Sequence, residues 1–211
     1  MTLPVTSAHG VRQALKLPRL LVVADSAYTG GRPLLVAVRE AVAGGARAVW
    51  LRDKQAAAGD RRRVAEALAE MLHAVGGLLI ESPGPGSGAG DGVHLGAADL
   101  WPGQDGPVAV GRSCHNHSEL SRASAEGCQW ATLSPIYRSE SKPGYGPALG
   151  PAALAGAPLP TWALGGVGAE NALECLGSGA AGIAVMGAVL RAADPASAVA
   201  RIQDRLDGVQ R

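Results

Sequence analysis

The sequence predicts an α/β fold of the (βα)8-barrel class. Short apolar runs, rich in Val, Leu, Ile and Trp, alternate along the chain with turn residues and with Ala/Leu-rich segments of helical spacing. The apolar runs are nearly continuous, which is typical of parallel strands that helices cover. Eight such runs within 211 residues favour a single compact TIM barrel over the rival arrangement, an open doubly wound sheet.

The predicted strands follow one another with intervals long enough for one helix or loop each. They are expected at residues 19–24, 46–52, 77–81, 92–95, 108–111, 130–134, 161–164 and 182–186. In a barrel of this class the functional residues follow the carboxyl ends of the strands. These ends are therefore the positions at which chemistry is expected.

The predicted helices lie between these strands. They are expected at residues 33–43, 60–75, 117–126, 169–178 and 195–209, with a short one at 151–155. Asp60 and Asp194 stand where N-cap residues belong, and Pro33, Pro151 and Pro195 suit first helical turns. Residues 83–90, Pro-Gly-Pro-Gly-Ser-Gly-Ala-Gly, oppose helical backbone, so the helix after the third strand is expected to be degenerate or replaced by a loop.

Composition and charge argue against several classes of protein. The net charge is +1, so no nucleic-acid partner is expected. The sequence contains no stretch of eighteen uninterrupted apolar residues, so no membrane span is expected either. Cys114, Cys128 and Cys175 are odd in number and lack metal-binding spacing, which favours a reduced, cytoplasmic location. The chain is expected to form one domain over residues 1–211, with residues 1–17 as a loose N-terminal extension.

The segment after the sixth predicted strand, residues 134–150, carries the strongest chemical signal. Ser139, Ser141 and Lys142 supply two hydroxyl groups and an ammonium group within four positions. Glycines at 144, 146 and 150 allow the backbone to close over a ligand. These groups predict an anionic, phosphate-bearing ligand.

Cations and glycines follow three other strand ends. Arg52 and Lys54 come after the second strand, where two positive charges suit a phosphate or diphosphate. Gly165-Gly-Val-Gly168 follows the seventh strand, and Met186-Gly-Ala188 follows the eighth. Barrels commonly bind phosphate through backbone amides at these last two positions, so the pair predicts a phosphate cradle.

The fourth and fifth strands carry titratable side chains. His94 lies within a strand and is interpreted as a core histidine, whereas Asp99 suits either Mg²⁺ binding or the capping of a short turn. His115 lies beyond the fifth strand, where an imidazole can perform acid–base chemistry near neutral pH. Cys114 is interpreted as core filler, while Arg112 either faces into the barrel or reaches a ligand.

The order of these motifs resembles that of thiamin phosphate synthase and its sister enzyme, the thiazole tautomerase. The matching segments are Leu21-Val-Val-Ala-Asp25, Leu51-Arg-Asp-Lys54, Asp91-Gly-Val-His-Leu-Gly96, Gly111-Arg-Ser-Cys-His115, Ser134-Pro-Ile-Tyr137 with Ser141-Lys-Pro143, Ala163-Leu-Gly-Gly-Val167 and Gly182-Ile-Ala-Val-Met186. The resemblance implies a barrel whose partner is a small phosphorylated heterocycle, a thiazole phosphate. A homodimer is compatible with it, although no surface pattern in the sequence decides the oligomeric state.

For the synthase branch, the resemblance implies coupling of an aminopyrimidine diphosphate to a thiazole phosphate with Mg²⁺. The residues retained for that task are Arg52, Lys54, Asp99 as the metal ligand, Ser113, Ser139, Ser141 and Lys142. Two departures count against it. Trp50 stands where the family's Gln-Leu-Arg-x-Lys pattern has glutamine, and Glu81-Ser82 replaces the family's Asn-Asp, so that only Glu81, one position away, is left to replace a metal-binding carboxylate.

For the tautomerase branch, the resemblance implies a proton transfer that aromatises the thiazole ring and needs no cofactor. His115 stands at the position of the tautomerase histidine and would be the catalytic residue. Gly166, Val167, Met186 and Gly187 would cradle the phosphate. Because of the two departures we favour the tautomerase over the synthase. A third alternative is a barrel that binds a thiazole phosphate without turnover.

Overall fold

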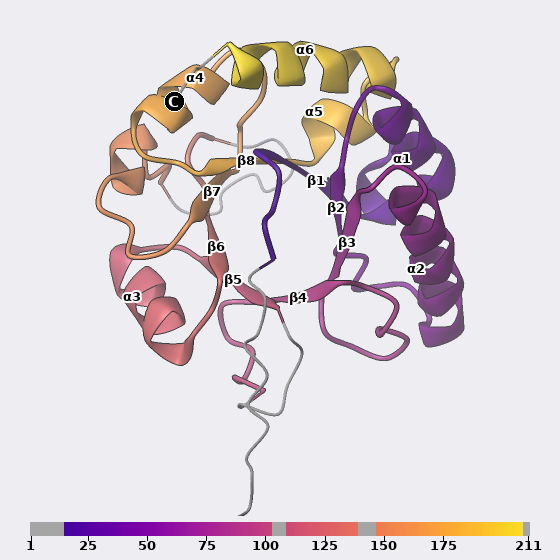
Figure 1. The fold of residues 1–211 in the computed structure, drawn as a ribbon, viewed down its shortest axis with the longest axis horizontal. Helices are drawn as coiled ribbons and strands as arrows, with labels where there is room; N and C mark the ends of the chain where they lie inside the picture. The colour runs from indigo at the N-terminus through magenta and orange to yellow at the C-terminus, as the bar shows by residue number, and fades with distance from the viewer. Residues whose placement is uncertain (1–14, 103–108, 139–146, 209–211) are drawn as a thin grey trace, which may run out of the picture.

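A closed barrel of eight parallel strands forms the centre of the computed structural model, which describes residues 15–102, 109–138 and 147–208. Each strand pairs with the next in sequence, and β8 (Gly182–Val185) pairs with β1 (Leu20–Ala24) to close the ring. Helices lie around the outside of this ring (Figure 1). The predicted (βα)8 barrel is therefore confirmed.

The strand positions agree with the sequence patterns to within two residues, except in β5. The remaining strands are β2 (Ala48–Leu51), β3 (Leu78–Glu81), β4 (Gly92–Leu95), β5 (Val110–Cys114), β6 (Trp130–Leu133) and β7 (Thr161–Leu164). The predicted strand at 108–111 is wrong at its carboxyl end. Ser113 and Cys114 pair in register with Thr132 and Leu133, so the ladder with β6 carries β5 three residues further.

The helices begin where local capping allows. They are α1 (Leu34–Ala43), α2 (Ala58–His73), α3 (His117–Glu126), α4 (Ala172–Gly177), α5 (Gly187–Leu190) and α6 (Pro195–Asp207), with 3-10 turns η1 (Ser26–Tyr28) and η2 (Pro151–Leu154). Asp194 caps α6 as predicted, because its carboxylate accepts a hydrogen bond from the Ser197 amide. Asp60 is not an N-cap, since α2 starts two residues before it and Ala57 is the capping position. Neither η1 nor α5 was among the predicted elements.

The segment between β3 and β4 is a loop instead of a helix, as its glycines and prolines predict. Glu81 holds this loop: its Oε1 accepts hydrogen bonds from the amides of Gly88, Ala89 and Gly90 at 2.9, 2.9 and 2.8 Å. Figure 1 shows loops in place of a helix beside β4. The buried carboxylate thus fixes the backbone of this loop through three hydrogen bonds.

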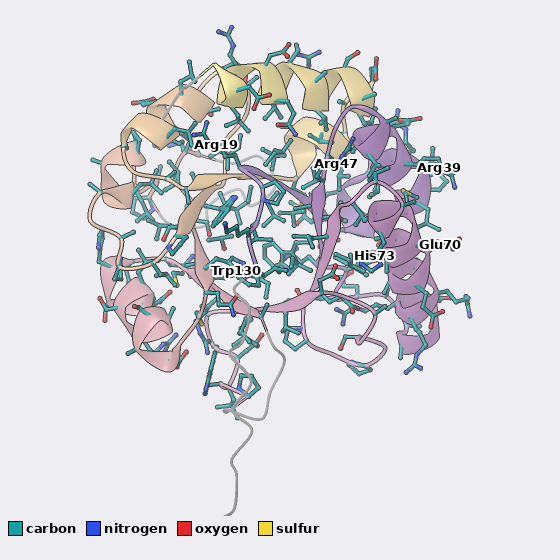
Figure 2. The ribbon with its side chains drawn as sticks, in the orientation of Figure 1. Arg19, Arg39, Arg47, Glu70, His73 and Trp130 are labelled. Carbon is teal, nitrogen blue, oxygen red and sulfur yellow. The ribbon has the colours of Figure 1, made fainter. Side chains whose placement is uncertain are left out.

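Large and small residues alternate inside the barrel. The interior cluster includes Trp50, Trp130 and Trp162, and Trp130 lies within the ring of strands, whereas Arg39 and Glu70 lie on the outer helices (Figure 2). A Cβ atom on Gly111 would lie 2.1 Å from the Trp130 ring. A glycine on the neighbouring strand is therefore required for this indole to fit, and the tryptophans fill an interior in a chain that has no phenylalanine.

Residues near the amino terminus close the other end of the barrel. Of the expected extension, residues 1–14 lie outside the described part of the chain. Leu15 and Leu17 pack against the interior cluster, and the Leu15 amide donates to the Gln129 side chain at 3.0 Å. In the described segments, no helix has the length and apolar character that a membrane crossing requires.

Candidate functional site at the carboxyl ends of the strands

Arg52 is fixed at the mouth of the barrel by a carboxylate from the neighbouring strand. Its Nη1 lies 2.6 Å from Oδ2 of Asp25, which directly follows β1. Asp25 is nearly buried, whereas a quarter of the Arg52 side chain is exposed. The guanidinium group is therefore oriented while part of it stays accessible to a ligand. Lys54, two residues further on, is exposed.

Asp25 is a residue that sequence reasoning did not place in the site. Its carboxylate also accepts a hydrogen bond from the Ala27 amide at 3.1 Å, so it caps η1 as well as holding Arg52. An aspartate after the first strand is the signal that could have identified it, because parallel strand ends meet at one edge of the barrel.

Trp50 points into the barrel. Its indole is 4 % exposed, and its Nε1–H donates to the Ser82 hydroxyl at 3.0 Å. The ring also packs on the His94 imidazole, with centroids 4.1 Å apart. The only hydrogen-bond donor of the Trp50 side chain is therefore already paired with Ser82 and is not available to a ligand. It presents an apolar ring at this level of the interior.

His94 is a core histidine, as predicted, and is joined to several polar groups. It accepts or donates hydrogen bonds with Trp130 Nε1 at 3.0 Å, Ser113 Oγ at 3.2 Å and Thr132 Oγ1 at 3.2 Å. Burial, and then the positive charges of Arg112 and Lys54, lower the pKa of His94 to about 3. The imidazole is therefore neutral at physiological pH. Ser113, which is partly exposed, connects this buried group to the mouth.

Glu81 does not replace the missing metal-binding carboxylate. It faces outward from β3 and is 1 % exposed, with its Oε1 committed to the three loop amides. Asp99 lies in the turn after β4 and is partly exposed, and its Oδ2 accepts from the Gly96 amide at 2.6 Å. This hydrogen bond closes the turn that precedes Asp99, so it is not the N-cap bond that the sequence offered as an alternative, which would come from an amide two or three residues later. Oδ1 is left for a ligand.

Arg112 faces away from the barrel interior and braces the loop that carries Asp99. Its Nη1 donates to the carbonyl groups of Gly96 at 3.1 Å and Asp99 at 2.8 Å, and its Nη2 lies 2.8 Å from a Glu126 carboxylate oxygen. Neither alternative considered from the sequence, a barrel-interior charge or a ligand contact, describes it. Cys114 beside it is fully buried, and burial raises its thiol pKa to about 12, in agreement with core filler.

Asp99 is the carboxylate at this mouth that we consider as a ligand for a magnesium ion. No group of three or more His, Cys, Asp or Glu side chains within the described ranges could form a metal cage. Mg²⁺, however, is commonly held by one or two carboxylates together with substrate phosphate oxygens and water. Asp99, with Oδ1 available at the mouth, fits that mode of binding.

The His115 side chain contacts a backbone carbonyl just after β6, the next strand. Its Nδ1 lies 2.7 Å from the Ser134 carbonyl oxygen, which can only accept, so Nδ1 carries a proton. The His115 amide donates to Glu119 Oε2 at 2.8 Å, which fixes the backbone at the start of α3. In the neutral imidazole the lone pair is then on Nε2.

The loops after β7 and β8 present backbone amides at the mouth. Gly166 has a φ of +64°, and a Cβ there would lie 2.4 Å from the Arg138 carbonyl oxygen. The Asn171 side chain accepts from the Gly168 amide and donates to the Gly166 carbonyl, both at 2.9 Å. Among the described residues, nothing accepts a hydrogen bond from the amides of Gly166 and Val167.

The corresponding amide after β8 belongs to Gly187, the first residue of α5, and Met186 precedes it as the capping residue. Met186 is partly buried and packs against both the interior and the outer apolar cluster. The two loops therefore place backbone amides after β7 and β8, the positions at which the phosphate cradle is predicted.

The ends of the 134–150 loop are fixed, whereas Ser139, Ser141 and Lys142 lie outside the described residues. The Leu149 amide donates to the Pro135 carbonyl at 2.9 Å, and the Gly150 amide donates to the Ile136 carbonyl at 3.0 Å. The Tyr137 amide in turn donates to the Gly165 carbonyl at 2.9 Å. The loop thus leaves and re-enters the fold beside the first glycine of the β7 loop.

The fold defines the class of protein, the (βα)8 barrels, and cationic side chains and glycine-containing loops follow several of its strands. The comparisons narrow the class. The sequence profile of the family described as thiamine monophosphate synthase (TMP-TENI) matches residues 20–189. The chain belongs to this family.

Named relatives cover nearly the whole chain. A thiamine-phosphate synthase from Methanoculleus marisnigri is 36 % identical over 200 residues, which cover 89 % of this chain and 94 % of the relative. One from Anaeromyxobacter dehalogenans is 39 % identical over 188 residues, covering 82 % and 83 % of the two chains. A solved thiamine phosphate pyrophosphorylase from Pyrococcus furiosus superposes with a TM-score of 0.79 at 24 % identity, covering 90 % of this chain and 96 % of that one, and supports the fold.

These relatives correct the function favoured from the sequence. The tautomerase, an isomerase, is contradicted as the leading assignment, because the relatives that match most of the chain are named thiamine-phosphate synthase. The error came from the weight given to Trp50 and to Glu81-Ser82. In the structure Trp50 and Ser82 contact each other, within a chain that matches a named synthase over 89 % of its length.

Proposed function

We propose that this protein is a thiamin phosphate synthase, a transferase that joins an aminopyrimidine diphosphate to a thiazole phosphate and releases diphosphate. The observation that carries the proposal is that the chain is 36 % identical to a thiamine-phosphate synthase, over 89 % of its length. Cationic, hydroxyl and backbone-amide groups at the carboxyl ends of its strands support the proposal. In the reaction the C–O bond to diphosphate breaks, the thiazole ring nitrogen donates its lone pair to the pyrimidine methylene carbon, and diphosphate leaves with the bonding electrons.

The cations and hydroxyl groups of the mouth are proposed to bind the diphosphate. Arg52, held by Asp25, would contact it through the exposed part of its guanidinium group. Lys54 and Ser113 would contribute from the neighbouring strand ends, and Ser139, Ser141 and Lys142 from the 134–150 loop. The fixed base of that loop supports this role, since it returns the chain to the β7 side of the mouth.

The β7 and β8 loops are proposed to bind the phosphate of the thiazole. The amides of Gly166, Val167 and Gly187 would donate to its oxygens, and Met186 would pack against the bound molecule. Donors fixed before the ligand arrives bind an anion without a further ordering cost.

Asp99 is the residue proposed to hold Mg²⁺, through Oδ1. When bound, the ion would neutralise charge on the departing diphosphate. Arg112 would keep the Asp99 turn in place through its contacts with the Gly96 and Asp99 carbonyls. His115 has no proton to move in this reaction, because the attacking nitrogen uses a lone pair. Its contact with the Ser134 carbonyl supports a role in holding the base of the loop.

The test is production of thiamin phosphate by the purified protein from both substrates in excess Mg²⁺. We expect product formation, and we expect Asp99→Asn to raise the Mg²⁺ concentration needed for half-maximal rate by at least about tenfold, as loss of a charged ligand should. Asp60→Asn, on the exposed first turn of α2, is the matched control and should leave that concentration unchanged. Calorimetric binding of thiazole phosphate without any product would contradict the proposal and favour a non-catalytic barrel.

A further inference from the structure

A chain of hydrogen bonds runs from the barrel interior to Ser113 at the mouth. It consists of Trp130, His94 and Ser113, with Thr132 as a side branch from His94. His94 and Thr132 are fully buried, Trp130 is 1 % exposed and Ser113 is partly exposed. Because these four residues come from β4, β5 and β6, the chain crosses three adjacent strands.

The direction of each hydrogen bond follows from what the groups can do. The Trp130 indole N–H is only a donor, so His94 Nδ1, at 3.0 Å, must be an acceptor and carry no proton. An imidazole that is neutral therefore carries its proton on Nε2. That proton is then shared between Ser113 Oγ and Thr132 Oγ1, each 3.2 Å away.

The consequence for Ser113 is a defined role. Its oxygen accepts from His94, so its own hydroxyl proton cannot point back at that nitrogen. Among the residues that the structure describes, the Ser113 side chain has no other hydrogen-bond partner. The remaining direction is the mouth, where Arg52 and the β7 and β8 loops converge at the carboxyl ends of the strands.

We propose that Trp130 and His94 are positioning residues that make Ser113 a hydrogen-bond donor toward a phosphate oxygen of the bound diphosphate. A serine hydroxyl can normally donate or accept. Here the Nε2–H of His94 occupies one lone pair of the oxygen, so the hydroxyl proton is directed away from His94 and toward the mouth before the ligand binds. The inference deepens the proposed function and rests on it for the identity of the ligand, but not for the direction of the hydrogen bonds.

The fit of Trp130 supports a specific contact over simple interior packing. Gly111, on the adjacent strand, lacks the side chain that would collide with the indole at 2.1 Å. Trp162 occupies an equivalent place against Gly182, yet its Nε1–H donates to the Pro18 carbonyl at 3.1 Å and takes no part in the network. Trp162 therefore serves as a matched control for Trp130, because it packs in the same way but lies outside the network.

The first test is the tautomer of His94 in the wild-type protein, read from ¹⁵N NMR of the imidazole nitrogens. The chain has five histidines, so the His94 signals would be assigned by their loss in His94→Gln. We expect a neutral ring with the proton on Nε2. A proton on Nδ1 would overturn the proposal whatever reaction the protein catalyses.

The second test is calorimetric binding of inorganic diphosphate with Mg²⁺. Trp130→Phe removes the donor that fixes the tautomer, and we expect diphosphate to bind about threefold to tenfold more weakly. Trp162→Phe deletes an equivalent indole and should change binding less than about twofold. Both variants are checked for folding by circular dichroism, and the tautomer measurement stands if Trp130→Phe does not fold.

A double-mutant cycle separates positioning from general loosening of the barrel. In a Ser113→Ala background there is no hydroxyl to orient, so adding Trp130→Phe should weaken diphosphate binding less than about twofold further. Equal effects of Trp130→Phe with and without Ser113 would overturn the proposal. Product formation by the wild type is measured separately, so a failed synthase assay beside a positive cycle would refute the proposed function alone.

Discussion

Lowering the pH from 7 to 5 should reduce the free energy of unfolding through His94. The pKa of this histidine falls from 6.5 to about 3 on folding, because the buried ring loses its hydration and lies near the positive charges of Arg112 and Lys54. Between pH 6.5 and about pH 3 the His94 imidazole binds a proton in the unfolded chain but not in the folded protein. Stability therefore falls as the pH drops below 6.5 and stops falling, for this group, near pH 3.

The magnitude follows from the linkage relation. At pH 5 the unfolded imidazole is 1.5 pH units below its pKa of 6.5, which corresponds to a loss of about 2 kcal/mol. The whole window down to pH 3 corresponds to about 4 to 5 kcal/mol. Other groups titrate over the same range, so the useful quantity is the difference between wild type and a His94 variant.

The assay is urea unfolding at pH 7 and pH 5, followed by circular dichroism. His94→Gln should lose about 2 kcal/mol less than the wild type over this interval, whatever its stability at pH 7. Parallel pH dependences for wild type and His94→Gln would show that His94 is protonated in the folded state, and the reasoning about its burial would fail.

Two further predictions concern the groups that hold the barrel together. Glu81→Gln should lower the free energy of unfolding by about 1.5 to 3 kcal/mol, because three amides lose a charged acceptor. The control, Glu66→Gln on the exposed face of α2, should change it by less than about 0.5 kcal/mol. Equal urea midpoints for the two variants would contradict the role given to Glu81. Gly111→Ala should cost at least about 1 to 3 kcal/mol by forcing Trp130 to move, while Gly177→Ala, with open space around its Cβ, should be neutral or slightly stabilising in thermal unfolding.

The fold was predictable because its signal is repeated. Apart from β5, whose sequence is Val-Gly-Arg-Ser-Cys, the strands are largely apolar runs of four or five residues. A glycine or a polar residue follows every strand except β8, so an error at one strand does not alter the count. The third helix was correctly expected to be missing, since glycine and proline dominate 83–90. Helix starts were less predictable. The sequence suggested Asp60 as the N-cap of α2, but the N-cap is Ala57. Asp60 lies in the first turn of the helix, where its negative charge still lies near the helix N-terminus.

The site was predictable in its position but not in its contacts. Strand ends are sequence features, whereas the side-chain pairs across them depend on register between strands. Asp25 reaches Arg52 because β1 and β2 are adjacent and in register, and no spacing along the chain indicates that contact. Glu81 was considered as a metal ligand from its place in the sequence. The alternation of side chains along β3 turns it outward, to the loop that replaces the helix.

The two departures that misdirected the functional prediction form a single contact. Trp50 and Ser82 were counted as independent losses, an amide donor on one strand and a carboxylate on the next. In the structure the indole N–H donates to the Ser82 hydroxyl at 3.0 Å, inside the barrel. A buried indole needs an acceptor, and a small hydroxyl residue supplies one without adding charge beside the neutral His94 ring. A change at Trp50 alone would remove the donor that now pairs with Ser82, and a change at Ser82 alone would leave a buried N–H without a partner. The pair therefore behaves as one coupled alteration of the barrel interior, and one alteration weighs less against a shared reaction than two.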